Sequence, residues 1–257
     1  MELGQPFVHG KRIAFFGGSF DPPHLGHLAV ARAARSALAL DTVIFAPVGA
    51  QPLKPQGSTA SFRDRLAMTR LAIGTEPGFA VSLADAPKAT GMPNFTLETL
   101  LALRAELPSD GALFCLMGTD SFFGLHKWHR PAEIPFVAPL IVASRPGQRP
   151  EQWIAGLRRA LPPGLEIETG SGEEIPRSDV EVRSFLLHDA AGNTASLYLL
   201  PGLNVEISAS QIREQVREQL GGQPRKQANP GAATQGDAPQ LLPSAVFEYI
   251  RAHGLYR

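Results

Sequence analysis

The stretch RIAFFGGSFDPPHLGHL, which spans Arg12–Leu28, decides the fold of this 257-residue chain. Apolar residues at 13–16 suit a buried strand, glycines and prolines interrupt the pattern over 17–23, and an amphipathic stretch begins at Gly26. A strand, a glycine turn and a helix in this order are typical of parallel sheets with helical crossovers, in which ligands bind where strands end. Because glycine has no Cβ, backbone amides here can approach a phosphate. The stretch therefore predicts an α/β fold with an anion site between Gly17 and His27.

The rest of the core alternates short apolar runs with amphipathic stretches in the same way. The predicted fold is a Rossmann-like, doubly wound and mainly parallel sheet. The expected strands are Arg12–Phe16, Thr42–Val48, Phe79–Ala84, Ala112–Met117 and Leu140–Ala143. The expected helices are Gly26–Leu38, Ser61–Ile73, Thr96–Glu106, Asp120–His126 and Glu151–Leu161, with Ser61 and Asp120 as N-terminal caps.

The last third of the chain has a different pattern. Two alternating runs over 183–200 flank Ala191-Gly192-Asn193, which indicates a hairpin appended to the sheet. A strand at Asn204–Ile207, a helix at 209–220 and a helix at 243–253 follow, and Val246, Phe247 and Ile250 would dock the last helix. Residues 221–240, rich in Gly, Pro, Gln and Ala, resemble a flexible insertion. We expect one domain over 1–257, with a core at about 11–208 and a C-terminal helical portion at about 209–257.

Composition excludes several classes of partner. Lys plus Arg and Asp plus Glu number 24 each, so no global field attracts nucleic acid or an anionic membrane. The single cysteine, Cys115, lies in an apolar run and is expected to be buried packing in a reducing compartment. No uninterrupted apolar stretch approaches the length of a membrane span, and residues 1–12 have no apolar core of signal-peptide length. We expect a cytoplasmic protein.

Two histidines stand in the glycine-rich turn. His24 and His27 are spaced i and i+3 at the start of the predicted helix, so their rings can point into one space. A lone histidine here would more simply be a cap or a packed core residue, but a pair in such a turn favours a phosphate-binding function. Asp21 and the prolines that follow it suit a tight turn. Neither a G-x-G-x-x-G nor a G-K-[ST] motif occurs here, which argues against a dehydrogenase and a P-loop kinase.

A second candidate helix start lies in the segment ISASQIRE, which begins at Ile207. Ser208 or Ser210 can cap the helix, its free amides can receive phosphate oxygens, and Arg213 adds a fixed positive charge one turn later. Capping alone could explain the serines. A triphosphate, however, is long enough to be held at two places.

With both motifs in view, the chain resembles the HxGH nucleotidyltransferases and, among them, bacterial nicotinate mononucleotide adenylyltransferases. The resemblance covers nearly the whole chain and rests on several blocks in order, namely GGSFDPPHLGHL, Gly118-Thr119-Asp120-Ser121, Trp128, Ser144-Arg145-Pro146-Gly147, ISASQIRE and the final HGLYR. It implies transfer of an adenylyl group from ATP to nicotinate mononucleotide, with Mg²⁺ bound mainly through the substrate phosphates and no dedicated protein metal ligands.

The resemblance also implies residue roles. His24, His27 and Arg213 would be catalytic, His27 acting at the α-phosphate and Arg213, with Ser208 and Ser210, at the departing phosphates. The ATP site would comprise Gly17, Gly18, Ser19, Phe20, His24, Gly26, His27, Gly118, Asp120, Ser208, Ser210 and Arg213. The acceptor site would comprise Lys54, Phe95, Thr96, Asp120, Trp128, His129 and Arg145. Trp128 would stack on the pyridine ring, and backbone amides near Thr96 and His129 would hold its carboxylate.

Some features depart from the family's usual pattern. Leu53 stands where histidine is common, Ser210 stands where threonine is common, and 183–200 and 221–240 look like insertions that could form an oligomer contact. Other readings stay open. The acceptor could be another phosphorylated molecule such as phosphopantetheine, although Trp128 argues against it, or the chain could be an ATP-sensing module without turnover. A tRNA synthetase is set aside, since the chain lacks room for a tRNA-reading domain.

Overall fold

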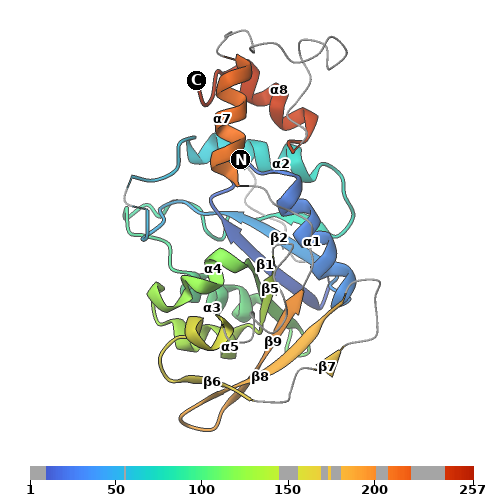
Figure 1. The fold of residues 1–257 in the computed structure, drawn as a ribbon, viewed down its shortest axis with the longest axis vertical. Helices are drawn as coiled ribbons and strands as arrows, with labels where there is room; N and C mark the ends of the chain where they lie inside the picture. The colour runs from blue at the N-terminus through green and yellow to red at the C-terminus, as the bar shows by residue number, and fades with distance from the viewer. Residues whose placement is uncertain are drawn as a thin grey trace.

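The computed structural model describes residues 10–54, 56–144, 156–168, 173–174, 181–200, 208–220 and 241–257 (Figure 1). Within these residues, nine strands form one sheet in the order β3-β2-β1-β4-β5-β9-β8-β6, with β7 paired to β8. The strands are β1 Arg12–Gly18, β2 Thr42–Pro47, β3 Phe79–Val81, β4 Ala112–Gly118, β5 Leu140–Ala143, β6 Leu165–Ile167, β7 Glu173–Glu174, β8 Arg183–Asp189 and β9 Thr194–Leu200.

The strand order reverses at β1. Strand β1 pairs in parallel with β2 on one side, where Phe16 lies opposite Phe45, and with β4 on the other, where Phe16 lies opposite Leu116. The chain first moves outward from β1 through β2 to β3 and then returns to β4 and β5. Ligands of doubly wound sheets bind at such a switch point, beside the carboxyl ends of the two central strands.

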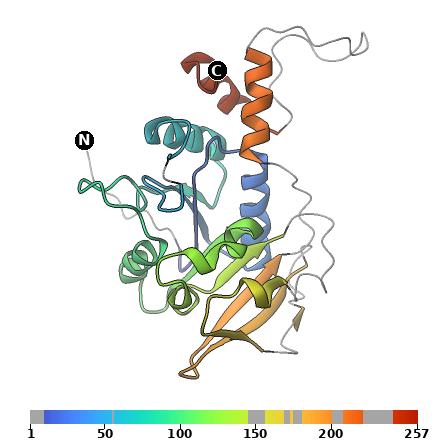
Figure 2. The ribbon, with the colours of Figure 1, turned by 60° about the vertical axis from the view of Figure 1, so that its left-hand side comes forward.

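Helices cover both faces of the sheet (Figure 2). They are α1 Leu25–Ala37, α2 Phe62–Ile73, α3 Thr96–Glu106, α4 Thr119–Phe123, α5 Ile134–Val137, α7 Ala209–Leu220 and α8 Ser244–His253, with 3₁₀ turns at Leu125–Lys127 and Pro131–Glu133. None of the helices in the described ranges is long and apolar enough to cross a membrane.

The side chains of β1 alternate between two cores, as the twofold period of a strand requires. Ile13 and Phe15 join the core under α3, to which that helix contributes Leu97, Leu100 and Leu103. Ala14 and Phe16 join the core under α1, with Leu28, Ala31 and Ala34 from that helix. Because β1 is buried on both faces, the turn that follows it is fixed on a rigid support.

The C-terminal helices pack away from the sheet. Helices α7 and α8 meet α2 in a third apolar cluster, which includes Ile212 and Val216 of α7 and Met68 of α2. Figure 1 shows the three helices together at one end of the molecule. Val246, Phe247 and Ile250 are buried in this cluster, so the prediction that they dock the last helix is confirmed.

Most of the predicted elements are confirmed, and Ser61 caps α2 by accepting a hydrogen bond from the Asp64 amide. The predicted cap at Asp120 is wrong. Strand β4 runs directly into α4 with Gly118 in extended geometry as the N-cap, so Asp120 already lies inside the first helical turn. Helix α4 also ends at Phe123, before the predicted end at His126.

The 183–200 hairpin is confirmed as the antiparallel pair β8 and β9. Its description as an appendage is wrong, because β9 pairs in parallel with β5 and continues the central sheet. Strand β9 is buried at alternate positions on that sheet, which explains the alternating pattern. The predicted strand at 204–207, the insertion at 221–240 and the first part of the predicted helix at 151–161 lie outside the described residues.

Candidate active site

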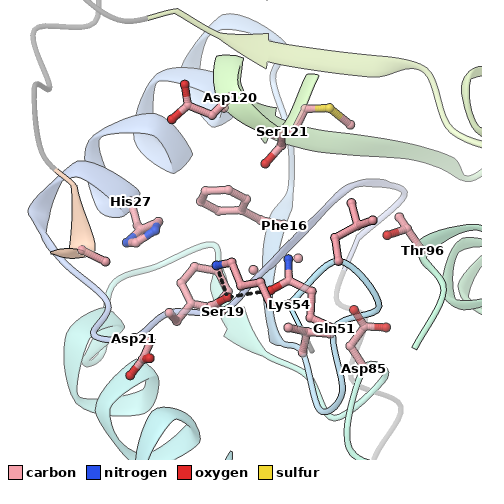
Figure 3. Close-up of a pocket in the computed structure, with 18 of the residues that line it drawn as sticks. Phe16, Ser19, Asp21, His27, Gln51, Lys54, Asp85, Thr96, Asp120 and Ser121 are labelled. Atoms are coloured by element: carbon pink, nitrogen blue, oxygen red, sulfur yellow. Dashed lines mark hydrogen bonds between the residues drawn. The ribbon is translucent and has the colours of Figure 1, made fainter. Parts of the chain in front are cut away.

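A cavity of about 840 Å³ opens at the switch point, beside the carboxyl ends of β1 and β4. It brings together the predicted site residues of both substrates: Gly17, Gly18, Ser19, Phe20, His24, Gly26, His27, Lys54, Phe95, Thr96, Gly118, Asp120, Trp128, His129, Ser208, Ser210 and Arg213 all line it. Arg145 lies outside the described residues. Figure 3 shows His27, Ser19, Lys54, Thr96 and Asp120, which come from five different segments, around this one space.

The two imidazoles lie against each other at the start of α1. Their ring centroids are 3.7 Å apart, and His24 is the N-cap of the helix. The ring of Phe20 meets His27 edge-on at 4.9 Å. Phe20 itself has a φ of 47°, a left-handed conformation that is uncommon outside glycine and that clusters at functional sites.

Burial keeps both imidazoles neutral. It lowers the pKa of His24 to about 4. Burial, together with the neighbouring His24 ring, lowers the pKa of His27 well below its usual value. The backbone amide of His24 donates to Nδ1 of His27 at 3.2 Å. A neutral imidazole that accepts at Nδ1 carries its proton on Nε2, so His27 offers one hydrogen-bond donor.

Asp21 fixes the turn between β1 and α1. Its carboxylate is buried and accepts hydrogen bonds from the backbone amides of Thr59 and Ala60, at 2.6 and 3.1 Å. The hydroxyl of Tyr256 donates to the same carboxylate at 2.7 Å. The turn-forming role expected for Asp21 thus includes contacts to two distant segments.

Arg65 is a second support of the turn, and sequence reasoning missed it. Its guanidinium donates to the carbonyls of Ser19 at 2.6 Å, Val48 at 2.7 Å and Ala60 at 3.3 Å. Only 2% of the residue is exposed. The sequence does indicate that Arg65 is buried, because its spacing from Met68, Thr69 and Ala72 places all four residues on the core-facing side of α2.

The start of α7 approaches this turn from the other end of the chain. Ser208 caps the helix, since its Oγ accepts from the Gln211 amide at 3.2 Å while Gln211 accepts from the Ser208 amide. Ser210 does not cap, but its Oγ accepts from Nη2 of Arg213 at 3.1 Å. Nη1 of Arg213 donates to the carbonyl of Asp21 at 2.7 Å. The two predicted phosphate-binding segments, at 17–27 and 207–214, are therefore in direct contact through Asp21 and Arg213.

Lys54 reaches the same cavity through a short hydrogen-bonded chain. Its Nζ donates to Oγ of Ser19 at 3.2 Å, and that hydroxyl donates to Oε1 of Gln51 at 3.0 Å (Figure 3). Leu53, which stands where the family commonly has histidine, is exposed beside it. Gln51 is a cavity residue that sequence reasoning did not single out.

Aromatic side chains line the other end of the cavity. The rings of Phe95 and His129 lie 4.5 Å apart, and half-buried Trp128 packs against the core beneath them. Phe95 is the N-cap of α3, so the free amides of the first turn begin at Thr96, which lines the cavity. A flat ring and an anionic group would both find partners here.

Asp85 is a buried carboxyl on the cavity wall that had no recognisable signal in the sequence. It accepts a hydrogen bond from Oγ1 of Thr99 at 2.5 Å, and burial raises its pKa. Burial, with Asp85 nearby, raises the pKa of the Cys115 thiol to about 12. Cys115 is therefore an inert core residue, as expected.

Comparison with known proteins assigns the chain to a family. The profile of the cytidylyltransferase-like family matches residues 15–215. A protein of Trichlorobacter lovleyi named "probable nicotinate-nucleotide adenylyltransferase" is 33% identical over 96% of this chain and 99% of its own length. One of Laribacter hongkongensis with the same name is 36% identical over 95% of this chain and 94% of its own length.

A solved structure has a similar fold. The Plasmodium falciparum nicotinic acid mononucleotide adenylyltransferase complexed with NaAD superposes with a TM-score of 0.59 over 96% of this chain and 98% of its own, at 15% identity. The shared fold agrees with the mainly parallel sheet described above. The chain therefore belongs to the cytidylyltransferase-like family and, within it, to the nicotinate-nucleotide adenylyltransferases.

Proposed function

We propose that this chain transfers the adenylyl group of ATP to nicotinate mononucleotide, giving deamido-NAD and pyrophosphate. One observation carries the proposal beyond family membership. A single cavity is lined by the imidazole pair of α1, by Arg213 of α7 and by the aromatic end around Trp128. Such a cavity can hold a triphosphate and a second nucleotide against each other.

In the proposed reaction, an acceptor phosphate oxygen attacks the α-phosphorus of ATP. The bond from that phosphorus to the bridging oxygen breaks, and pyrophosphate leaves with the bonding electrons. The acceptor phosphate is already ionised near neutral pH, so no general base is needed and positioning with charge stabilisation provides the catalysis.

His27 is the proposed donor to the α-phosphate. Its protonated Nε2 is fixed by the bond at Nδ1, and its neutral state persists because burial lowers its pKa. A neutral donor held in place can stabilise charge that develops on the phosphate oxygens without a proton transfer. His24, whose ring lies tilted against it at 3.7 Å, would hold the ring in orientation.

At the other end of the triphosphate, we assign Ser208, Ser210 and Arg213 to the β and γ phosphates. Helix α7 is long enough to present free first-turn amides and a partial positive charge to an anion. Arg213 adds a full charge held by two hydrogen bonds. Lys54, Ser19, Phe20 and the glycines Gly17, Gly18, Gly26 and Gly118 would complete the contacts around the phosphates and ribose.

The acceptor nucleotide is proposed to bind at the aromatic end, its ring against Trp128 and its carboxylate at the amides around Thr96 and His129. Asp120, exposed at the cavity, can accept hydrogen bonds from ribose hydroxyls. A carboxylate on the ring would be favoured by the N-terminal end of α3.

Mg²⁺ fits this site as a substrate-borne ion. Among the described residues, no group of three or more His, Cys, Asp or Glu side chains could hold a metal ion. Mg²⁺ commonly binds through substrate phosphates and keeps much of its water shell, so it needs few protein ligands. Bound there, it would neutralise part of the negative charge of the two polyanions.

The test is a comparison of acceptors. Purified protein is given MgATP with nicotinate mononucleotide, nicotinamide mononucleotide or phosphopantetheine, and both pyrophosphate and the adenylylated product are quantified. We expect deamido-NAD with matching pyrophosphate from the first acceptor. Product from phosphopantetheine but not from nicotinate mononucleotide would assign a different acceptor. ATP binding with no pyrophosphate from any acceptor would indicate a sensor.

A further inference from the structure

Tyr256 contacts Asp21, in the turn between β1 and α1, although the two residues are 235 positions apart in the chain. Its hydroxyl donates to Oδ1 of Asp21 at 2.7 Å, and the residue is 6% exposed. Its φ is 63°, in the left-handed region that a bulky side chain rarely occupies. A conformation of this kind persists only where surrounding contacts hold it.

Two elements of the C-terminal portion therefore meet at Asp21. Tyr256, which follows α8, binds the carboxylate, while Arg213 of α7 binds the backbone carbonyl at 2.7 Å. Burial and the adjacent Asp21 raise the pKa of Tyr256, so the phenol keeps its proton and can only donate toward the carboxylate. The direction of the contact is therefore fixed, with the phenol as donor and the carboxylate as acceptor.

Within the described part of the chain, the Asp21 carboxylate has three hydrogen-bond donors, of which one is a side chain. The amides of Thr59 and Ala60 come from the loop before α2. The Thr59 amide binds Oδ2, and the Ala60 amide and the Tyr256 hydroxyl both bind Oδ1. Because hydrogen bonds to a charged group are about twice as strong as neutral ones, losing the hydroxyl would let the Asp21 side chain and peptide readjust. The carbonyl that anchors Arg213 belongs to that same residue.

We infer that Tyr256 is a positioning residue for the adenylyl transfer: through Asp21 it fixes the Arg213 guanidinium at the place where pyrophosphate departs. This inference rests on the proposed role of Arg213. A guanidinium on a flexible side chain stabilises developing charge best when its direction is set in advance. Tyr256 itself does not line the cavity.

The first test uses two tyrosine variants. Tyr256→Phe removes only the hydroxyl, and Tyr249→Phe is its matched control, because the Tyr249 hydroxyl binds Asp64 at 3.0 Å outside the cavity. We expect Tyr256→Phe to lower kcat about tenfold, which corresponds to about 1.4 kcal/mol, and to leave the KM of the acceptor unchanged. Tyr249→Phe should have wild-type kcat.

Kinetics are measured well below the thermal midpoint of each variant, so that a loss of kcat reports on folded enzyme. A lower midpoint with unchanged kcat for Tyr256→Phe would overturn the inference, because it would show a purely structural hydroxyl. If that variant is insoluble, Asp21→Asn replaces it. That change removes the charge that the hydroxyl binds and also one of the two oxygens that accept from the Thr59 and Ala60 amides, so a kcat loss of at least about tenfold is expected and an unchanged kcat would overturn the inference.

The second test asks whether Tyr256 acts through Arg213. Arg213→Met keeps the length of the side chain and removes both of its hydrogen bonds. In this background, Tyr256→Phe should lower kcat less than twofold, since the group that it positions is gone. Losses that multiply would overturn the inference. A wild-type kcat for Arg213→Met would instead refute the proposed role of Arg213, so the two failures are distinguishable.

Discussion

The backbone amide of His24 donates to Nδ1 of His27 at 3.2 Å, which fixes the tautomer of the second imidazole. The backbone of the cap residue thus orients a histidine one turn later, and the proton of His27 stays on Nε2. The HxGH spacing has a direct geometric meaning here. It places the two rings against each other, with centroids 3.7 Å apart and planes inclined by 31°, and leaves the Nε2–H of His27 as a donor for a phosphate oxygen.

Replacing this donor tests its role. We expect His27→Ala to lower kcat by roughly a hundredfold to a thousandfold, the usual loss for one well-placed donor to developing charge. The circular dichroism spectrum should be unchanged. His126→Ala is the matched control, because His126 is an exposed histidine that does not line the cavity. Near-normal turnover of His27→Ala would refute the role.

The histidine pair also predicts a pH dependence of stability. Burial lowers the pKa of His24 to about 4 in the folded chain, whereas the unfolded value is near 6.5. The unfolded state therefore binds the proton more readily, and stability from the buried neutral ring is complete above about pH 6.5 and is lost as the pH falls towards 4. The loss from His24 alone amounts to about 3 kcal/mol at pH 4. His27 acts in the same direction.

The measurement is urea unfolding of the wild type and of His24→Gln between pH 4 and 8. The variant has no ring to protonate, so its free energy of unfolding should fall less steeply below pH 6.5. Parallel curves for the two proteins would contradict a neutral His24. Above pH 6.5, turnover should show no step from protonation of either imidazole.

The aromatic end of the cavity predicts a selective effect on the acceptor. Trp128→Ala should raise the KM for nicotinate mononucleotide roughly tenfold through loss of stacking and apolar contact, with little change in the KM for ATP. Phe123→Ala serves as the control, since Phe123 is an exposed aromatic of α4 away from the cavity. Equal changes in both KM values would argue against a ring stacked on Trp128.

The sequence predicted the strands and helices because these depend on local patterns, and it predicted the cavity residues through the family motifs. Apolar runs such as 13–16 and the glycine turn specify strand, turn and helix without reference to distant residues. Hairpin β8–β9 shows what local patterns do not predict. Its alternating pattern indicated two paired strands, but the parallel pairing of β9 with β5 depends on a tertiary neighbour that alternation does not specify.

The same limit applies to the supports of the site. The cavity residues with family motifs were identified, whereas Arg65 and Asp85 were not. The position of Arg65 on the buried side of α2 was readable, but the carbonyls that it binds were not, and the burial of Asp85 against Thr99 depends on how α3 packs. The prediction that Asp120 caps its helix was wrong for a related reason. A carboxylate near a helix start usually caps it, but here β4 leaves no loop residue between strand and helix.

Arg65 predicts a stability effect. In Arg65→Met, the carbonyls of Ser19 and Val48 lose their buried donor, and the free energy of unfolding should fall by about 3 kcal/mol. Arg65→Lys keeps the charge but cannot reach both carbonyls, so an intermediate loss is expected. Urea unfolding at pH 7 measures both. Arg63→Met, on the exposed side of α2, should lie within about 0.5 kcal/mol of the wild type.

Ser210 gives a prediction particular to this chain, since threonine is common at its position in the family. Its Oγ accepts from Nη2 of Arg213 at 3.1 Å, and the residue is exposed, so an added methyl group has room. Ser210→Thr should keep kcat within about twofold, because the hydroxyl that orients Arg213 remains. Ser210→Ala removes that acceptor and should lower kcat by about five- to tenfold, the effect of one hydrogen bond to a charged group. If Ser210→Ala matched the wild type while Ser210→Thr did not, the methyl group rather than the hydroxyl would decide activity, and the proposed orientation of Arg213 by Ser210 would be wrong.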